Sequence, residues 1–184
     1  MIDTLPLIPS FSTLRLHLRP FSSEDAHDVY VLASDVSVAK FTFVPHPYPV
    51  GAAASWIDGH EEEARSGRQL SWAITRRERL VGCVELAFND FHGWAEIGFW
   101  LGAPHRGRGY ATEAAERVLA YAFEKRGRRR VQAAVFVENE ASARVLARLG
   151  LRREGTLRAY GRPSSWRSGD SWMYGMTRQD FERR

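Results

Sequence analysis

The sequence predicts an α+β protein with one mixed, mostly antiparallel central sheet flanked by helices. Segments with strand-like and helix-like patterns follow one another in the order β-α-α-β-β-β-α-β-α-β. Three of the strand patterns are consecutive between residues 69 and 101 and are separated only by polar turns, which indicates an antiparallel meander. No repeat, low-complexity tract or linker interrupts the chain, so we expect a single domain over residues 1–184.

The first part of the chain predicts a strand, two helices and an ordered loop. Residues 13–19 alternate leucine with arginine or histidine, the period of a half-buried strand. Ser22 followed by Asp25 resembles a capping signal for a helix that ends near residue 34. A second helix is expected over residues 52–65. Between the two, "KFTFVPHPYPV" contains three prolines and therefore favours an ordered loop.

The rest of the chain alternates strands with two longer helices. Strands are expected in "QLSWAITR", "LVGCVELAF", "WAEIGFWL", "RRVQAAVF" and, as the last strand, "SWMYGMT". Residues 109–126 place apolar side chains at helical spacing, with Gly127 as a stop signal. A further helix is expected over residues 139–150, where Gly150 is the stop.

Composition and charge narrow the class of protein. The net charge is +4, and 24 of the 26 basic residues are arginine, because only Lys40 and Lys125 are lysine. Such a surface favours anionic ligands such as phosphates, yet the arginines are not interleaved with stacking aromatics as in a nucleic-acid groove.

Cys83 is the only cysteine, which excludes an intrachain disulfide and a cysteine-clustered zinc site. No apolar run reaches the roughly 20 residues of a membrane span, and the start lacks signal-peptide features, so we expect a cytoplasmic protein.

A glycine-rich basic loop, "RGRGYA" at residues 106–111, joins the third strand of the meander to the helix that follows. Unpaired backbone amides and the dipole at a helix start favour phosphate oxygens, and glycine lets an anion approach closely. The loop lacks the Gly-Lys-Ser/Thr of a Walker A motif and the context of a Rossmann fingerprint. Taken alone it is also compatible with an ordinary strand-to-helix turn.

Several separated segments together resemble the GNAT acyltransferase superfamily. Arg106, Gly109 and Ala111 match its pyrophosphate-loop pattern Arg/Gln-x-x-Gly-x-Gly/Ala. The segments "AEIGFWL", "GYATEA" and "NEASARVLARLGLRREGTLR" are similar to the branch that contains the ribosomal-protein N-terminal-alanine acetyltransferases. The resemblance covers nearly the whole chain. It implies acetyl-CoA as the donor, an amine as the acceptor, direct transfer in a ternary complex, and no metal.

The resemblance also implies which residues contact the cofactor. In the family, the strand before the loop separates from its neighbour and binds the pantetheine arm through its backbone. Residues 98–101 occupy that position, and Asn139 and Ser142 match a pantetheine contact and a hydroxyl beside the thiol. Asn139 is also a natural helix cap. The implied cofactor-binding set is Phe99, Trp100, Leu101, Arg106, Gly107, Arg108, Gly109, Tyr110, Ala111, Asn139 and Ser142.

Two glutamates are candidates for the base that amide formation from a thioester requires. Glu85 and Glu96 each stand among apolar neighbours on one face of a predicted strand. Such surroundings raise a carboxyl pKa toward the range of a general base. An ordinary solvated or ion-paired glutamate is the alternative for either residue. We prefer Glu96, keep Glu85 second, and assign Ser142 to the departing thiolate.

Two positions depart from the family pattern. Many members carry a tyrosine acid seven residues after the asparagine, where this chain has Leu146. Relatives in the ribosomal branch pair the helix serine with a glutamate after the "EGxL" segment, where this chain offers Tyr160 and Gly161. The route of the proton and the ribosomal acceptor therefore stay open.

The acceptor side is predicted to involve the proline-rich loop. His46 and Tyr48 combine an aromatic body with a polar tip suited to orienting a substrate, and Tyr160 is a further candidate. Phe41 and Phe43 are expected to pack the loop onto the core. We expect the acceptor to be a peptide or protein N-terminal amine, with a small amine such as a polyamine or antibiotic as the alternative. A non-catalytic acyl-CoA-binding module is the rival outside enzymes, and a homodimer is one option for the assembly.

Overall fold

The computed structural model describes residues 7–161 and 169–184. Its strands form one sheet in the order β1-β2-β3-β4-β5-β6-β8-β7. The strands are β1 Phe11–Ser12, β2 His17–Arg19, β3 Gln69–Arg76, β4 Arg79–Asn89, β5 Trp94–Leu101, β6 Arg130–Phe136, β7 Arg152–Gly161 and β8 Gly169–Thr177. The helices are α1 Ala26–Ala33, α2 Val36–Ala39, α3 Ala52–Arg65, α4 Tyr110–Glu124, α5 Glu140–Arg148 and α6 Arg178–Glu182. In the part of the chain that the structure describes, no helix is long and apolar enough to cross a membrane.

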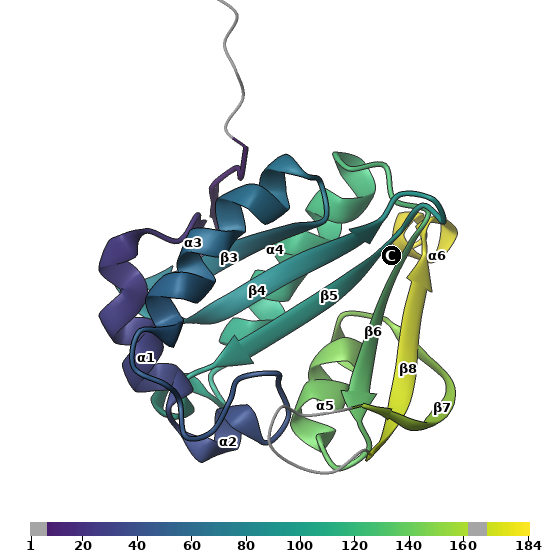
Figure 1. Ribbon diagram of the computed structural model, residues 1–184. Helices are drawn as coiled ribbons and strands as arrows, with labels where there is room; N and C mark the ends of the chain where they lie inside the picture. The colour runs from purple at the N-terminus through teal and green to yellow at the C-terminus, as the bar shows by residue number, and fades with distance from the viewer. Residues whose placement is uncertain (1–6, 162–168) are drawn as a thin grey trace, which may run out of the picture.

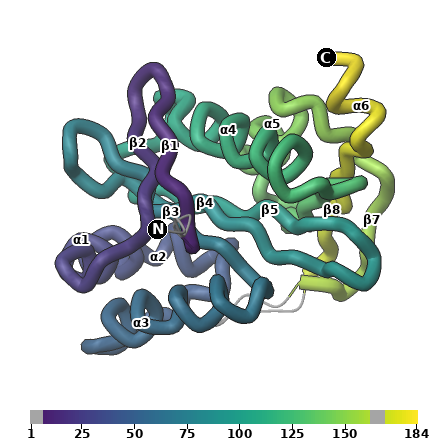
Figure 2. Tube along the Cα trace, turned by 90° about the horizontal axis from the view of Figure 1, so that it is seen from above, coloured from purple at the N-terminus to yellow at the C-terminus, as the bar shows by residue number. Residues whose placement is uncertain are grey.

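Helices cover both faces of the sheet. Figure 2 shows α4 and α5 on one side of the strands and α1, α2 and α3 on the other. Trp72 and Val84 are paired across β3 and β4 and are buried in one cluster with Val118 of α4. Ala73 points the opposite way, into a second cluster with Ile57 of α3. This alternation makes the meander strands apolar on both faces, as expected for a sheet between two helical layers.

The sheet opens between β5 and β6. All neighbouring strands are antiparallel except this pair, which is parallel and is joined only at Trp94↔Arg130, Ala95↔Val131 and Glu96↔Gln132. Beyond Glu96, β5 keeps its ladder with β4 through Leu101. Figure 1 shows β5 and β6 close together at their starts and diverging toward their ends. The divergence leaves one edge of β5 available at residues 98–101.

The predicted α+β class and most predicted elements are confirmed. The second predicted helix has the bounds of α3, and the three meander segments form β3, β4 and β5. The first predicted helix forms as a short 3₁₀ turn followed by α1, and the Ser22 amide donates to the Asp25 carboxylate at 2.8 Å as the capping signal requires. Gly127 and Gly150 follow α4 and α5 with φ values of +63° and +83°, the left-handed conformation of helix stops.

One expectation about the elements is wrong, and two elements were not predicted. Residues 13–19 do not form one strand, because the Thr13 amide donates to the Leu16 carbonyl at 2.9 Å and closes a turn between β1 and β2. Leu14 stands at the turn and is 94% exposed. β7 was not predicted, because this edge strand is mostly exposed and shows no apolar alternation. The single turn of α2 is too short to give a periodic pattern.

Candidate active site

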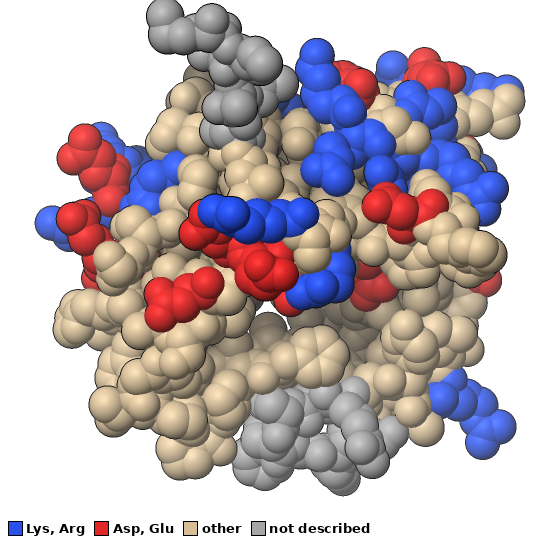
Figure 3. Space-filling view, turned by 45° about the horizontal axis from the view of Figure 1, so that its top comes forward, with Lys and Arg blue, Asp and Glu red and all other residues tan. Residues whose placement is uncertain are grey.

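A cleft of about 1440 Å³ lies where β5 and β6 separate. Its walls come from β5, the end of β6, the start of α4, α5, and the segment from α2 to Tyr48. Figure 3 shows a hollow near the centre of one face of the molecule, with acidic side chains at its upper border. Charged side chains therefore border a cleft whose walls include the elements predicted to bind the cofactor.

Glu85 and Glu96 are brought to the same face of the sheet. Glu85 is opposite Gly98, and Glu96 is opposite Ala87, so the two carboxylates are diagonal neighbours on adjacent strands. Both line the cleft and both are half-buried. Gly98 makes this arrangement possible, because a Cβ there would lie 2.8 Å from Oε1 of Glu85.

The surroundings of the two carboxyl groups favour their protonated forms. Burial raises the pKa of Glu85, and the neighbouring Glu96 raises it further. Burial also raises the pKa of Glu96, although the Gln132 amide donates to its Oε2 at 3.4 Å and acts in the opposite direction. Gln69 donates to Oε2 of Glu85 at 3.1 Å. The hydrogen-bond partners of both carboxyl groups among the described residues are neutral amides rather than arginines, so no ion pair offsets the effect of burial on either pKa.

Sequence reasoning missed these two glutamines. Gln132 is the parallel partner of Glu96, and Gln69 is the antiparallel partner of Ala87. Both positions follow from strand registers that single-strand patterns do not reveal. The polar member of the alternation in "RRVQAAVF" was the available signal for Gln132. Phe136, which forms part of the cleft wall at the end of β6, was also missed.

The loop of residues 106–111 lies at the end of the cleft where α4 begins. Gly107 and Gly109 have φ values of +72° and +79°, which side chains other than glycine rarely adopt. Gly109 is the N-cap of α4 and provides no side-chain cap, so it leaves the first amides of the helix to another partner. A Cβ at Gly107 would meet no atom within 4 Å, so the backbone there is open to a ligand.

Arg106 is exposed, but its guanidinium is hydrogen-bonded to the protein. Its Nε donates to the Leu101 carbonyl at 2.9 Å, and its Nη1 donates to the Ser37 hydroxyl at 2.7 Å. Arg106 thus joins the end of β5 to α2, and it lines the cleft. Gly107, Gly109, Tyr110 and Ala111 also line it, as do Phe99, Trp100 and Leu101 of β5. Arg108 is exposed and does not.

The start of α5 contributes Asn139 and Ser142. The Asn139 side chain accepts from the Ser142 backbone amide at 3.2 Å, so its capping role is formed. Both residues line the cleft, and within the described residues the Ser142 hydroxyl has no hydrogen-bond partner. Leu146, at the family's tyrosine position, is buried in the core and offers no acid.

Of the residues predicted to contact the acceptor, the structure brings some to the cleft and not others. Tyr48 and Tyr160 line it, and burial raises the pKa of Tyr48. His46 does not line the cleft. Phe41 packs against Phe136, with ring centroids 6.4 Å apart. The expectation that Phe43 packs onto the core is wrong, because its side chain is 82% exposed at the cleft.

The residues around the cleft do not resemble a metal centre. Among residues 7–161 and 169–184, no group of three or more His, Cys, Asp or Glu side chains could hold a metal ion. Within the part of the chain that the structure describes, the cleft combines a glycine-rich helix start, a strand edge with no neighbouring strand, two carboxyl groups with raised pKa and the Ser142 hydroxyl, which has no hydrogen-bond partner there. This set can bind an elongated anionic molecule and accept a proton beside it.

Comparison with known proteins agrees with this geometry. The family model described as "Acetyltransferase (GNAT) domain" matches residues 15–152. The chain is 32% identical over 157 residues to the uncharacterized N-acetyltransferase YoaA of Bacillus subtilis (strain 168), covering 84% of this chain and 89% of that protein.

Solved structures share the fold. Mycobacterium smegmatis RimJ in complex with CoA-disulfide superimposes with a TM-score of 0.82 and 26% identity, over 90% of this chain and 83% of that one. RimL, a ribosomal L7/L12 alpha-N-protein acetyltransferase in complex with coenzyme A, gives a TM-score of 0.83 at 18% identity, over 92% and 98% of the two chains. At that identity the RimL comparison shows the fold alone.

Proposed function

This chain belongs to the GNAT acetyltransferase family and is an acetyl-CoA-dependent N-acetyltransferase, and on that premise we propose that its acceptor is the amine of a peptide or protein N-terminus. The observation that carries the proposal is the pair Glu85 and Glu96, which stands on one face of the sheet where the cleft opens. In its ionised form Glu96 can accept a proton from the amine of an acceptor that enters the cleft.

We assign the base to Glu96, with Glu85 as its supporting neighbour. Transfer forms a C–N bond between the amine and the acetyl carbon and breaks the C–S bond of the thioester. An ammonium acceptor must lose one proton before attack and a second as the amide forms, while the thiolate gains one. Glu96 stands at the last pair that joins β5 to β6, directly at the point of separation, which favours it over Glu85.

The remaining cleft residues suit the donor. Acetyl-CoA supplies the activated acetyl group when bound. We propose that the amides at the start of α4, with Gly107 and Gly109, hold its pyrophosphate. We also propose that Asn139 and the edge of residues 98–101, which has no neighbouring strand among the described residues, bind its pantetheine. The free hydroxyl of Ser142 is assigned to the departing thiolate. Arg106 shapes this end of the cleft through Leu101 and Ser37.

One feature of the cleft supports an N-terminal amine over a small amine. The cleft, of about 1440 Å³, is bordered by exposed side chains such as Phe43 and Tyr160, which suits an acceptor that continues beyond its reacting end.

A thiol-release assay tests the proposal. The protein is incubated with acetyl-CoA and a panel of peptides with free N-termini, the same peptides with blocked N-termini, polyamines and aminoglycosides. We expect release with free N-terminal peptides and none with the blocked forms. Faster release with polyamines or aminoglycosides than with every peptide would contradict the proposed acceptor, and binding of acetyl-CoA without release would identify a binding module.

A further inference from the structure

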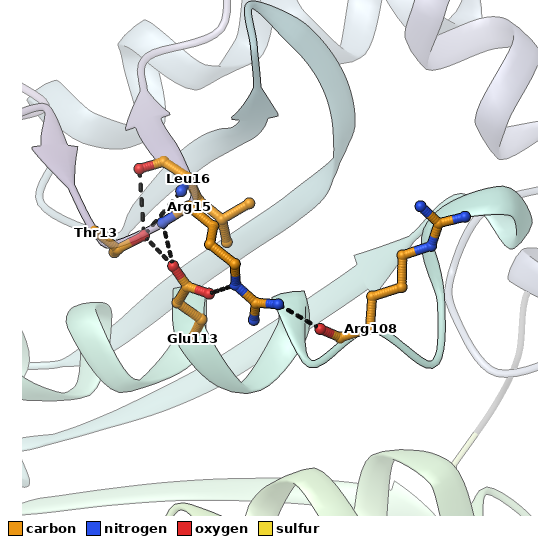
Figure 4. A network of polar contacts seen from close by, with 5 residues as sticks. All are labelled: Thr13, Arg15, Leu16, Arg108 and Glu113. Atoms are coloured by element: carbon orange, nitrogen blue, oxygen red, sulfur yellow. Dashed lines mark hydrogen bonds and ion pairs between the residues drawn. The ribbon is translucent and has the colours of Figure 1, made fainter.

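The turn between β1 and β2 is bonded to the first helical turn of α4 (Figure 4). The Glu113 carboxylate is the centre of this contact, although Arg15 is 98 residues away in sequence. Its Oε1 accepts from the Thr13 hydroxyl at 2.6 Å and from the Arg15 backbone amide at 2.8 Å. Its Oε2 accepts from Nε of Arg15 at 2.6 Å. These three hydrogen bonds are all shorter than 3 Å.

The same guanidinium reaches the glycine-rich loop. Nη1 of Arg15 donates to the Arg108 carbonyl at 2.9 Å. The group lies over the Tyr110 ring, 4.9 Å from its centroid, and Nη2 would be 3.3 Å from a Cβ at Gly109. Arg15 therefore contacts Arg108 and Tyr110, on either side of Gly109, while Glu113 fixes its orientation.

We propose that Arg15, oriented by Glu113, is a positioning residue that holds the backbone of residues 108–110 in the shape that receives the pyrophosphate of acetyl-CoA. The inference rests on the proposed cofactor role of this loop. By fixing the Arg108 carbonyl, Arg15 keeps that acceptor oxygen bonded within the protein and away from an incoming anion. The carbonyl is held on the side of the β1–β2 turn, which leaves the amides at the helix start as the groups available to the ligand.

A positioning role and a purely electrostatic role of Glu113 predict opposite changes in cofactor affinity when its charge is removed. Burial raises the pKa of Glu113, but hydrogen bonds from Thr13 and Arg15 outweigh it and keep the pKa below its usual value, so the group is charged at neutral pH. A negative charge in the first turn of α4 repels an anion bound there. If charge alone mattered, removing it would tighten cofactor binding. If positioning matters, removing it releases Arg15 and weakens binding.

The test measures CoA affinity by calorimetry for Glu113→Gln and Arg15→Lys. We expect each variant to bind CoA about tenfold more weakly, since a lysine ammonium cannot bridge Glu113 and the Arg108 carbonyl as the guanidinium does. The double variant should also bind CoA about tenfold more weakly than the wild type, the same loss as in each single variant, because both changes disrupt the same contact between Arg15 and Glu113. Turnover with acetyl-pantetheine, which lacks the pyrophosphate, should stay unchanged and shows that the variants are folded.

Arg76→Gln is the matched control. Arg76 lies over the same Tyr110 ring at 5.7 Å, but within the described residues no hydrogen bond joins it to the loop. Its removal takes away a nearby positive charge without releasing the Arg108 carbonyl, so CoA affinity should change by less than about twofold at 0.15 M salt.

Two outcomes would overturn the inference: unchanged or tighter CoA binding by Glu113→Gln, or an equal loss of turnover with acetyl-pantetheine. Gly107→Asp separates this failure from failure of the loop assignment itself. A Cβ at Gly107 meets no protein atom within 4 Å, so an aspartate there projects into the open side of the loop and adds negative charge without touching Arg15. If folded Gly107→Asp still binds CoA normally, the loop does not hold the pyrophosphate. If it loses CoA while Glu113→Gln does not, only the positioning role is wrong.

Discussion

The Gln132 side-chain amide donates to the Glu96 carboxylate at 3.4 Å, across the last pair of residues that joins β5 to β6. The sheet opens immediately beyond this contact. A carboxyl group with a raised pKa thus stands at the point from which the cleft widens, with a neutral partner rather than a cation beside it. This relationship is the basis for the assignment of the base.

Replacing Glu96 with glutamine should lower kcat by about 100-fold or more, because it removes a proton acceptor and keeps the shape of the side chain. Affinity for acetyl-CoA should be nearly unchanged. Steady-state kinetics and calorimetry measure the two effects. Glu85→Gln is the matched control on the adjacent strand, and a larger loss of turnover in that variant would transfer the assignment to Glu85.

The pH dependence of the wild type provides a second measurement on the same residue. A carboxylate base works only when ionised, and burial raises the pKa of Glu96. The acid limb of kcat/KM should therefore lie above the ordinary glutamate pKa of about 4.3, with activity rising as pH increases through it. An acid limb that is identical in Glu96→Gln would show that another group is being titrated.

Replacing Ser142 with alanine should lower kcat by about tenfold and change the KM for acetyl-CoA less, because a hydroxyl that bonds a developing thiolate acts mainly in the transition state. The Ser142 backbone amide still donates to Asn139, so α5 keeps its cap. A change confined to KM, with kcat equal to wild type, would make Ser142 a cofactor contact only.

Replacing Tyr48 with alanine should raise the KM for the acceptor several-fold and leave the affinity for acetyl-CoA unchanged, because Tyr48 lines the cleft on the acceptor side. His46→Ala is an informative comparison, since His46 does not line the cleft and should alter acceptor KM less. If the acceptor profile of Tyr48→Ala matches the wild type for every peptide, the loop is not part of the site.

Replacing His60 with leucine should remove part of the acid sensitivity of the fold. His60 is buried on α3 against Phe21 and Trp56, neither ring nitrogen has a hydrogen-bond partner among the described residues, and burial lowers its pKa to about 4. Because the pKa of His60 in the folded protein lies below the unfolded value of about 6.5, the neutral side chain costs no stability above pH 6.5. The free energy of unfolding decreases by about 3 kcal/mol as pH falls to 4, because His60 is protonated in the unfolded chain first.

Denaturant unfolding at pH 7 and pH 4.5 measures this effect. The difference in the free energy of unfolding between the two pH values should be smaller in His60→Leu than in the wild type. Equal differences in the two proteins would show that His60 does not contribute to acid destabilisation.

Much of the fold could be predicted because its longer elements have strong periods. The apolar alternation of β4 and β5 and the helical spacing of α4 gave these elements with bounds close to those observed. The exposed edge strand β7 and the turn at Leu14 could not be predicted, since one lacks a buried face and the other depends on a local hydrogen bond.

The site was only partly predictable for the same physical reason. The loop of residues 106–111 and the two glutamates are visible in sequence, because each depends on local residue types. Their arrangement depends on register between strands, which places Glu85 and Glu96 on one face and Gln132 beside Glu96. The contact of Arg15 with Glu113 joins segments that no local pattern relates.

The most direct test of the account is to locate the acetyl group on a peptide that offers two amines. A peptide with a free N-terminus and an internal lysine is incubated with acetyl-CoA and the protein, and fragment mass spectrometry identifies the modified amine. We expect one acetyl group on the N-terminal amine, and much less product with Glu96→Gln. Acetylation of the lysine side chain, or equal product with Glu96→Gln, would contradict it.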